Sequence, residues 1–121
     1  MSAALSACGG SSTVAVELVE PARAADVLED RADEVVLLDV RTPEEFNEVR
    51  VPGSINVDYY APDFSAQLDQ LAKDVPYVVY CRSGNRSSRT MDIMTDLGFS
   101  EVFDVAGGII AWNEAGLPLE N

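Results

Sequence analysis

Short apolar runs alternate along this sequence with segments in which apolar residues recur every three or four positions. Short runs rich in β-branched residues are typical of strands in a parallel sheet, and the wider spacing is typical of helices with one apolar face. The predicted strands lie at residues 14–19, 35–38, 54–57 and 77–80, with a last one through Val102, Phe103 and Val105. The predicted helices are one at 21–31, one starting at Thr42, one through Phe64, Leu68 and Leu71, one between Cys81 and Gly98, and a short one through Ile109 and Trp112. This alternation predicts one α/β domain with an open, mainly parallel sheet and helices on both faces.

Local signals mark the ends of two of these helices. Thr42 stands as an N-cap, with Glu45 as its reciprocal partner in a capping box. In that helix we expect Phe46 to face the core. Gly98 stands where a left-handed residue would end the helix after Cys81.

Composition limits the function classes. The chain has 121 residues, of which 47% are hydrophobic and 24% charged, as expected for one globular domain. Its net charge of −13 argues against binding nucleic acid or an anionic membrane through a broad basic face. The chain contains no histidine, which excludes Ser-His-Asp triads and His-ligated metal sites. We expect neither a metal nor an organic cofactor.

The start of the chain differs from the rest in composition. Residues 1–13 are small and polar, so we expect a flexible tail before a domain that spans 14–121. Leu5-Ser6-Ala7-Cys8, followed by Gly9-Gly10-Ser11-Ser12, resembles the lipobox and tether of bacterial lipoproteins. The resemblance implies a lipid anchor on Cys8 and an extracytoplasmic location. No charged segment and no long apolar segment precede this stretch, so a cytoplasmic protein with a flexible start is the alternative.

The loop after the predicted strand at 77–80 carries the candidate chemistry. Cys81 follows that strand directly, and the next six residues, RSGNRS, lead into a helix. In open α/β sheets ligands bind beyond the carboxyl ends of the strands, and such a loop directs several backbone N–H groups at one point. A cysteine at the base of this ring is expected to react as a thiolate. Gly84 permits the tight turn, and we expect Ser87 or Ser88 to cap the helix.

Basic residues are concentrated beside this cysteine. Only eight residues of the chain are Lys or Arg, and three of these, Arg82, Arg86 and Arg89, lie close after Cys81 with no acidic residue between. Guanidinium groups would hold a persulfide or a dianionic sulfur donor through charge-assisted hydrogen bonds. Taken alone, Cys81 is read as a small buried hydrophobic residue and the arginines as surface residues. The strand, loop and helix together favour catalysis.

Four motifs resemble the rhodanese homology domain and occur in its order. They are LLDVRTPEEF at 37–46, VPGSIN at 51–56, CRSGNRS at 81–87, and Gly107-Gly108 with Trp112. The resemblance covers nearly all of residues 15–119 and implies a single rhodanese-like domain. Arg50 stands where the family often has histidine, which implies different local packing but the same chemistry.

The resemblance also implies roles for individual residues. Cys81 would accept sulfur, Arg41 would approach the site, and Asp39 would support the structure. The loop would bind the substrate or the persulfide through Arg82, Ser83, Gly84, Asn85, Arg86 and Ser87.

The activity implied is that of a thiosulfate sulfurtransferase. A small anionic donor such as thiosulfate or a persulfide would load Cys81, and a thiol or cyanide would remove the sulfur. One alternative is a sulfur-carrier or binding module with little or no turnover. Another is a Cys-dependent phosphatase or arsenate reductase, but those enzymes have a longer loop than the four residues that separate Cys81 from Arg86. We expect a monomer, because no unusual exposed apolar stripe is evident in the sequence.

Overall fold

Five strands form one sheet in the computed structural model, which describes residues 15–121. The strands are β2 (Ala15–Val19), β3 (Val36–Asp39), β4 (Ile55–Asn56), β5 (Pro76–Tyr80) and β6 (Glu101–Val105). Their order in the sheet is β2-β6-β5-β3-β4, and every adjacent pair is parallel. The expected α/β fold with an open parallel sheet is confirmed.

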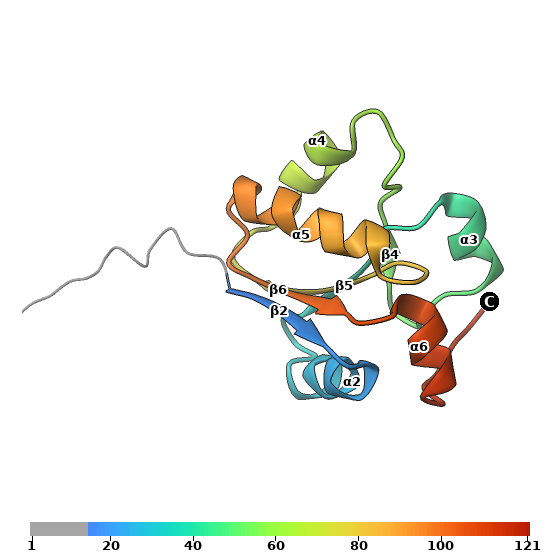
Figure 1. Cartoon of the computed structure of the whole chain (residues 1–121). Coiled ribbons are helices and arrows are strands. Elements are labelled where there is room, and N and C mark those ends of the chain that lie inside the picture. The colour runs from blue at the N-terminus through green and yellow to red at the C-terminus, as the bar shows by residue number, and fades with distance from the viewer. Residues whose placement is uncertain (1–14) are drawn as a thin grey trace, which may run out of the picture.

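Helices cover both faces of this sheet. They are α2 (Pro21–Asp30), α3 (Pro43–Glu48), α4 (Phe64–Asp69), α5 (Asn85–Leu97) and α6 (Gly108–Glu114). Figure 1 shows α4 and α5 on one face, and α2 and α6 on the other. The short helix α3 lies beyond the sheet, beside its carboxyl end. None of the helices described is long and apolar enough to cross a membrane.

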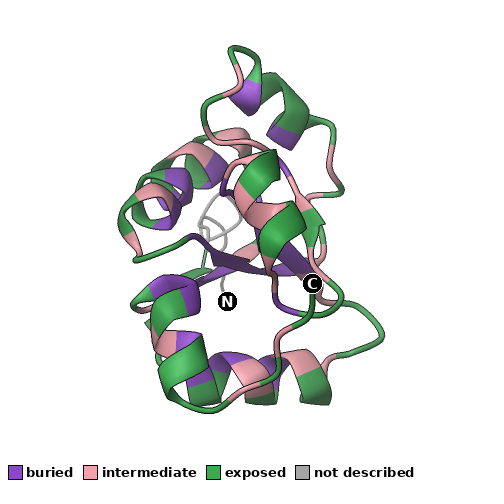
Figure 2. Cartoon of the chain, turned by 90° about the vertical axis from the view of Figure 1, so that its right-hand side faces the viewer, coloured by how far each residue is buried: buried purple, intermediate pink, exposed green. Residues whose placement is uncertain are grey.

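The two faces of the sheet are buried in separate cores. Val79 belongs to the core under α4 and α5, whereas its neighbour Val78 belongs to the core under α2 and α6, because successive side chains of a strand point to opposite faces. Both valines are fully buried, as are the other residues of β5. Figure 2 shows buried residues along the sheet and on the sides of the helices that face it. A strand buried on both faces reads as a continuous apolar run, which is why Tyr77–Tyr80 could be recognised in the sequence.

The ends of the helices follow the expected signals in part. Thr42 caps α3, and the capping box with Glu45 is complete: Thr42 Oγ1 accepts from the Glu45 N–H at 3.2 Å, and the Thr42 N–H donates to Glu45 Oε1 at 3.0 Å. Gly98 ends α5 with φ +90°, as expected. The prediction that Phe46 faces the core is wrong, because α3 buries no residue and the guanidinium of Arg50 covers the Phe46 ring at 4.9 Å.

The predicted tail and the lipobox cysteine lie outside the described residues. Residues 1–14, which include Cys8, precede the part of the chain that the structure describes. Lipidation of Cys8 and a tail at 1–13 therefore stay predictions.

Candidate functional site

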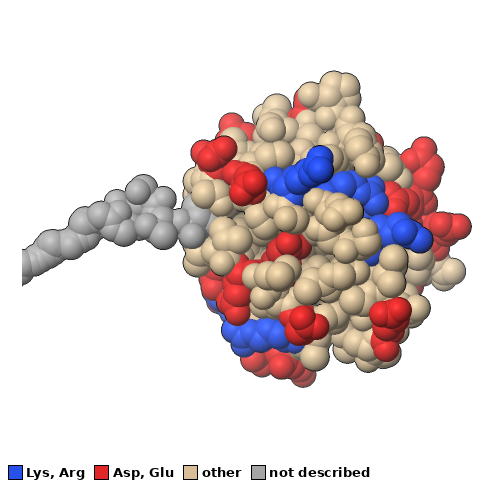
Figure 3. Space-filling model, in the orientation of Figure 1, with Lys and Arg blue, Asp and Glu red and all other residues tan. Residues whose placement is uncertain are grey.

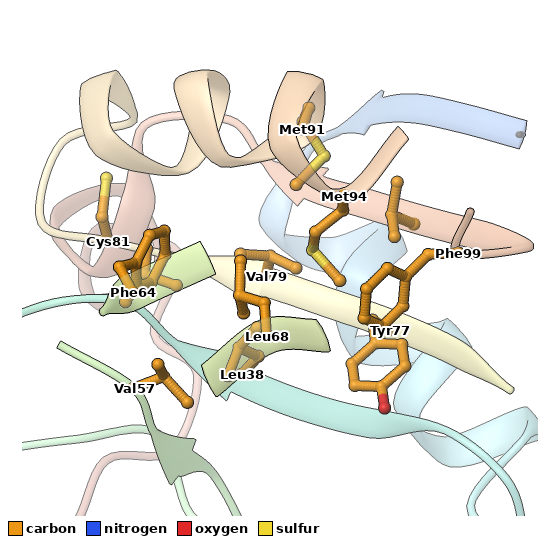
Figure 4. Close-up of a cluster of buried hydrophobic side chains, with 12 residues drawn as sticks. Leu38, Val57, Phe64, Leu68, Tyr77, Val79, Cys81, Met91, Met94 and Phe99 are labelled. Carbon is orange, nitrogen blue, oxygen red and sulfur yellow. The ribbon is translucent and has the colours of Figure 1, made fainter. Parts of the chain in front are cut away.

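Cys81 lies immediately after the central strand β5, at the carboxyl edge of the sheet. Its side chain is 1% exposed. Figure 4 shows its sulfur directed toward the start of α5, at the margin of the core that α4 and α5 cover. Cys81 is therefore buried in the core, as expected of a small hydrophobic residue. It is also the first residue of the loop, as expected of a cysteine at the base of a ring of N–H donors.

Backbone donors converge on the sulfur atom. The Gly84 N–H lies 3.0 Å from Cys81 Sγ and the Ser87 N–H lies 3.4 Å from it, while Ser87 Oγ stands at 3.5 Å. Gly84 has φ +110°, a left-handed backbone conformation that residues other than glycine rarely adopt. The turn at Gly84 directs its N–H at the sulfur. Such an arrangement stabilises negative charge on sulfur.

Ser87 has a different place from the one the sequence suggested. The N-cap of α5 is Gly84, without a side-chain cap, and Ser87 and Ser88 lie inside the helix, so the prediction that either serine caps it is wrong. Ser87 is fully buried, and its hydroxyl donates to the Gly84 carbonyl oxygen at 3.3 Å. The Ser87 hydroxyl and N–H group thus both contact residues of the 81–87 loop and do not cap the end of the helix.

Gly108 supports the loop from the other side. The first turn of α6 donates to the loop: the Ile109 N–H bonds the Cys81 carbonyl at 2.8 Å, and the Ile110 N–H bonds the Arg82 carbonyl at 3.2 Å. A Cβ atom on Gly108 would stand 2.4 Å from the Arg82 carbonyl oxygen. The glycine pair that the sequence presents as a turn is therefore also a close-packing site for the cysteine loop.

Arg86 pairs with an acidic side chain from another helix. Its Nη1 and Nη2 atoms donate to the two carboxylate oxygens of Glu45 at 2.8 and 3.0 Å. The Arg86 hydrogen bonds, with further ones from Thr42, lower the pKa of Glu45 to about 2. The guanidinium also lies 5.6 Å from the ring centre of Tyr60. Arg86, expected to hold a persulfide, thus links the start of α5 to α3.

Arg41 and Asp39 form a buried pair at the end of β3. Arg41 Nη2 donates to Asp39 Oδ2 at 2.7 Å and to the Val49 carbonyl at 2.6 Å, and Nε donates to both carboxylate oxygens. The Arg41 side chain is 3% exposed and, among the described residues, donates only to Asp39 and Val49. The structure therefore brings Arg41 to Asp39 and not into hydrogen-bonding contact with the 81–87 loop.

The remaining loop residues lie at the surface. Arg82, Ser83 and Asn85 are exposed, as is Arg89 one turn into α5. Figure 3 shows a band of basic side chains on the face where α5 lies, with acidic side chains around it. These groups are free to attract an anion from solvent.

Asp104 is a buried acidic residue beside the loop that no sequence motif indicated. This residue of β6 is 5% exposed, and its Oδ1 atom has no hydrogen-bond partner among the described residues. Burial raises the pKa of its carboxyl group, and the neighbouring Ser87 hydroxyl opposes this rise. The sequence shows Asp104 only as an acidic residue between Phe103 and Val105, in a strand that also begins with the acidic residue Glu101.

Asp104 also lines a cavity beside the loop. The cavity has a volume of about 300 Å³. Its walls are Leu18, Ser83, Gly84, Asn85, Ser88, Asp104, Val105, Ala106 and Gly107. Within residues 15–121, no three His, Cys, Asp or Glu side chains gather in a way that could hold a metal ion.

Comparison with known proteins finds similarity over most of the chain. The family described as "Rhodanese-like domain" matches residues 22–115. A sulfurtransferase of Allochromatium vinosum is 33% identical over 87 residues, which cover 72% of this chain and 79% of the relative. Thiosulfate sulfurtransferase 16, chloroplastic, of Arabidopsis thaliana is 38% identical over 91 residues, which cover 67% of this chain and 76% of the relative. Among solved structures, a rhodanese-related protein of Thermoplasma volcanium is similar with a TM-score of 0.71 and 32% identity, covering 86% of this chain and 97% of that one.

Proposed function

The chain belongs to the rhodanese-like family, and from this premise we propose that it is a sulfurtransferase that carries sulfane sulfur on Cys81. Relatives named as sulfurtransferases support this class of activity. The single observation that carries the assignment to Cys81 is the convergence of the Gly84 and Ser87 N–H groups on its sulfur. A ring of fixed donors favours the anionic states of sulfur that the reaction passes through.

The proposed cycle has two displacements. The Cys81 thiolate attacks the outer sulfur of thiosulfate; a bond forms between the two sulfur atoms, and the S–S bond of thiosulfate breaks with its electron pair going to sulfite. The persulfide anion on Cys81 then occupies the ring of N–H donors. An acceptor thiolate or cyanide attacks the outer sulfur, the bond between that sulfur and Sγ breaks, and Cys81 leaves as a thiolate. Neither step requires a histidine, because no proton must be moved once the thiolate exists.

The contacts of Arg86 favour sulfur transfer over phosphate chemistry. A phosphatase of this loop type needs a guanidinium directed at the phosphoryl oxygens. In this chain both terminal nitrogens of Arg86 bond Glu45. We therefore keep phosphatase activity only as an outcome of the test.

Intact mass tests the proposal. After incubation with thiosulfate we expect the protein to gain one sulfur atom, and cyanide to remove it as thiocyanate. Cys81→Ser should abolish the gain, whereas Cys8→Ser should retain it, since the chain has only these two cysteines. Sulfur on the Cys81→Ser protein would overturn the site. Loading without turnover by any acceptor would identify a carrier, and turnover of an aryl phosphate without loading would identify a phosphatase.

A further inference from the structure

Asp104 presents a charge problem that the described residues do not solve. It lies on a buried strand, is 5% exposed, and leaves Oδ1 without a hydrogen-bond partner. A buried carboxylate is unfavourable unless a cation or hydrogen-bond donors compensate it. No Lys or Arg is among the described residues that line the cavity beside it, and both terminal nitrogens of Arg86 are paired with Glu45. A cationic ligand would compensate the carboxylate.

The cavity in front of Asp104 has the size and lining for a small molecule. Its volume of about 300 Å³ lies at the lower end of the range for ligand pockets, so it suits a molecule of few heavy atoms. Ser83, Asn85 and Ser88 give the lining polar groups, and Leu18 gives it an apolar side chain. A short carbon chain with a charged end matches this combination.

The cavity adjoins the residues that contact the reactive sulfur. Gly84 lines the cavity, and its N–H lies 3.0 Å from Cys81 Sγ. The Ser87 hydroxyl oxygen lies 3.5 Å from Sγ, and the same hydroxyl is close enough to the Asp104 carboxyl group to oppose the rise in its pKa. A ligand held by Asp104 would therefore contact the loop that surrounds the sulfur.

We propose that this cavity is the acceptor subsite and that Asp104 binds the ammonium group of a small aminothiol. The inference rests on the proposed sulfurtransferase function. The acceptor's thiolate attacks the outer sulfur of the Cys81 persulfide anion and forms a new S–S bond. The bond from that sulfur to Sγ breaks, its electron pair stays on Sγ, and the products are the acceptor persulfide anion and the Cys81 thiolate.

Discharge of the persulfide by two matched thiols tests the acceptor. The full chain is loaded with thiosulfate and then treated with 2-aminoethanethiol or with its N-acetyl derivative, which lacks the charge. Each rate is divided by the rate of the same thiol with a small free persulfide, so that intrinsic thiol reactivity cancels. We expect a preference of about tenfold for the ammonium form, the size of one charge-assisted hydrogen bond. It should disappear in Asp104→Asn and persist in Asp92→Asn, which removes an exposed carboxylate from α5. Equal corrected rates in the native protein would overturn the subsite and leave the sulfurtransferase function standing.

A binding measurement makes the result independent of sulfur transfer. Ethylammonium chloride is titrated into unloaded, ¹⁵N-labelled protein, with potassium chloride as the control for ionic strength. We expect saturable shifts of the Gly84, Ser88 and Gly107 amide signals, lost in Asp104→Asn. Absence of shifts specific to ethylammonium would overturn the site even if loading fails. If those shifts occur in a protein that never loads, the cation site stands and the sulfurtransferase function falls.

Discussion

Gly108 lies so close to Cys81 that a Cβ atom on the glycine would stand 2.5 Å from the cysteine carbonyl oxygen. That same oxygen accepts the Ile109 N–H, so the start of α6 and the cysteine loop are held together through the main chain. The position of Cys81 is therefore set partly by a glycine that comes late in the sequence.

Replacement of Gly108 by alanine should destabilise the fold. The residue has φ +62° and no room for a side chain. We expect a loss of about 2–4 kcal/mol in the free energy of unfolding, from left-handed strain and overpacking together. Gly116→Ala is the matched control, because Gly116 has φ +76° with open space around it, and it should lose only about 1–2 kcal/mol. Urea denaturation measures both, and equal losses would contradict the packing argument.

The pair of Glu45 and Arg86 should make stability depend on pH. The pKa of Glu45 is lowered from 4.5 to about 2, so the folded protein binds this proton less readily than the unfolded chain does. The contribution is complete above pH 4.5 and is lost as the pH falls through about 2. Because the pair is partly solvated, we expect Glu45→Gln to lose about 1 kcal/mol at neutral pH and progressively less in acid.

The control for this prediction is Glu44→Gln, which changes an exposed neighbour on α3. Urea midpoints measured from neutral pH into acid should stay close to the native values for the control. Arg86→Gln should mimic Glu45→Gln, and the double variant should be no less stable than either single one, because both remove the same contact. Additive losses would mean that the two side chains act separately.

Loss of the Ser87 hydroxyl should slow the chemistry of Cys81. Ser87→Ala removes the hydrogen bond from the Ser87 hydroxyl to the Gly84 carbonyl, which holds the turn that directs the Gly84 N–H at the sulfur, and it keeps the Ser87 backbone donor. We expect alkylation by iodoacetamide and loading by thiosulfate to slow about fivefold at neutral pH, which corresponds to about 1 kcal/mol for one hydrogen bond. Ser65→Ala, an exposed change on α4, should leave both rates unaltered. Unchanged rates in Ser87→Ala would show that only the backbone groups matter.

The exposed arginines should attract the anionic donor from a distance. On a chain with net charge −13, Arg82 and Arg89 lie at the surface near the loop. We expect Arg82→Gln to lower kcat/KM for thiosulfate about twofold to fivefold at low salt, and the difference to vanish at high salt as screening removes it. Arg23→Gln, an exposed change on α2, should have no such effect. A loss that persists at high salt would indicate direct contact with the donor instead.

Much of this architecture could be read from local patterns. The strand at 77–80 was evident because a run buried on both faces leaves no polar position. Thr42 and Glu45 were recognisable because a capping box spans only one helical turn. Cys81 could be placed at the site because it follows a strand and precedes a glycine-containing loop and a helix. In a parallel sheet this order puts the residue at the carboxyl edge of the sheet.

Contacts between distant residues could not be read in this way. Glu45 and Arg86 lie 41 positions apart in the sequence. Each of them, taken alone, resembles an ordinary charged residue at the protein surface. Asp104 fits the alternation of an ordinary strand, so its burial emerges only when α5 and the loop are packed against β6. The prediction that Ser87 caps the helix is wrong because α5 begins at Asn85, two residues earlier, with the left-handed Gly84 as its N-cap.

The pairing of β2 with β6 has a consequence for how this protein is made. Ala15 is opposite Glu101 and Val19 is opposite Val105, so the first strand described has the last one as its partner. During synthesis on the ribosome, β2 must wait until nearly the whole domain has emerged before it can pair. Contacts between such distant segments slow folding, and a chaperone that shields this strand would act during that interval.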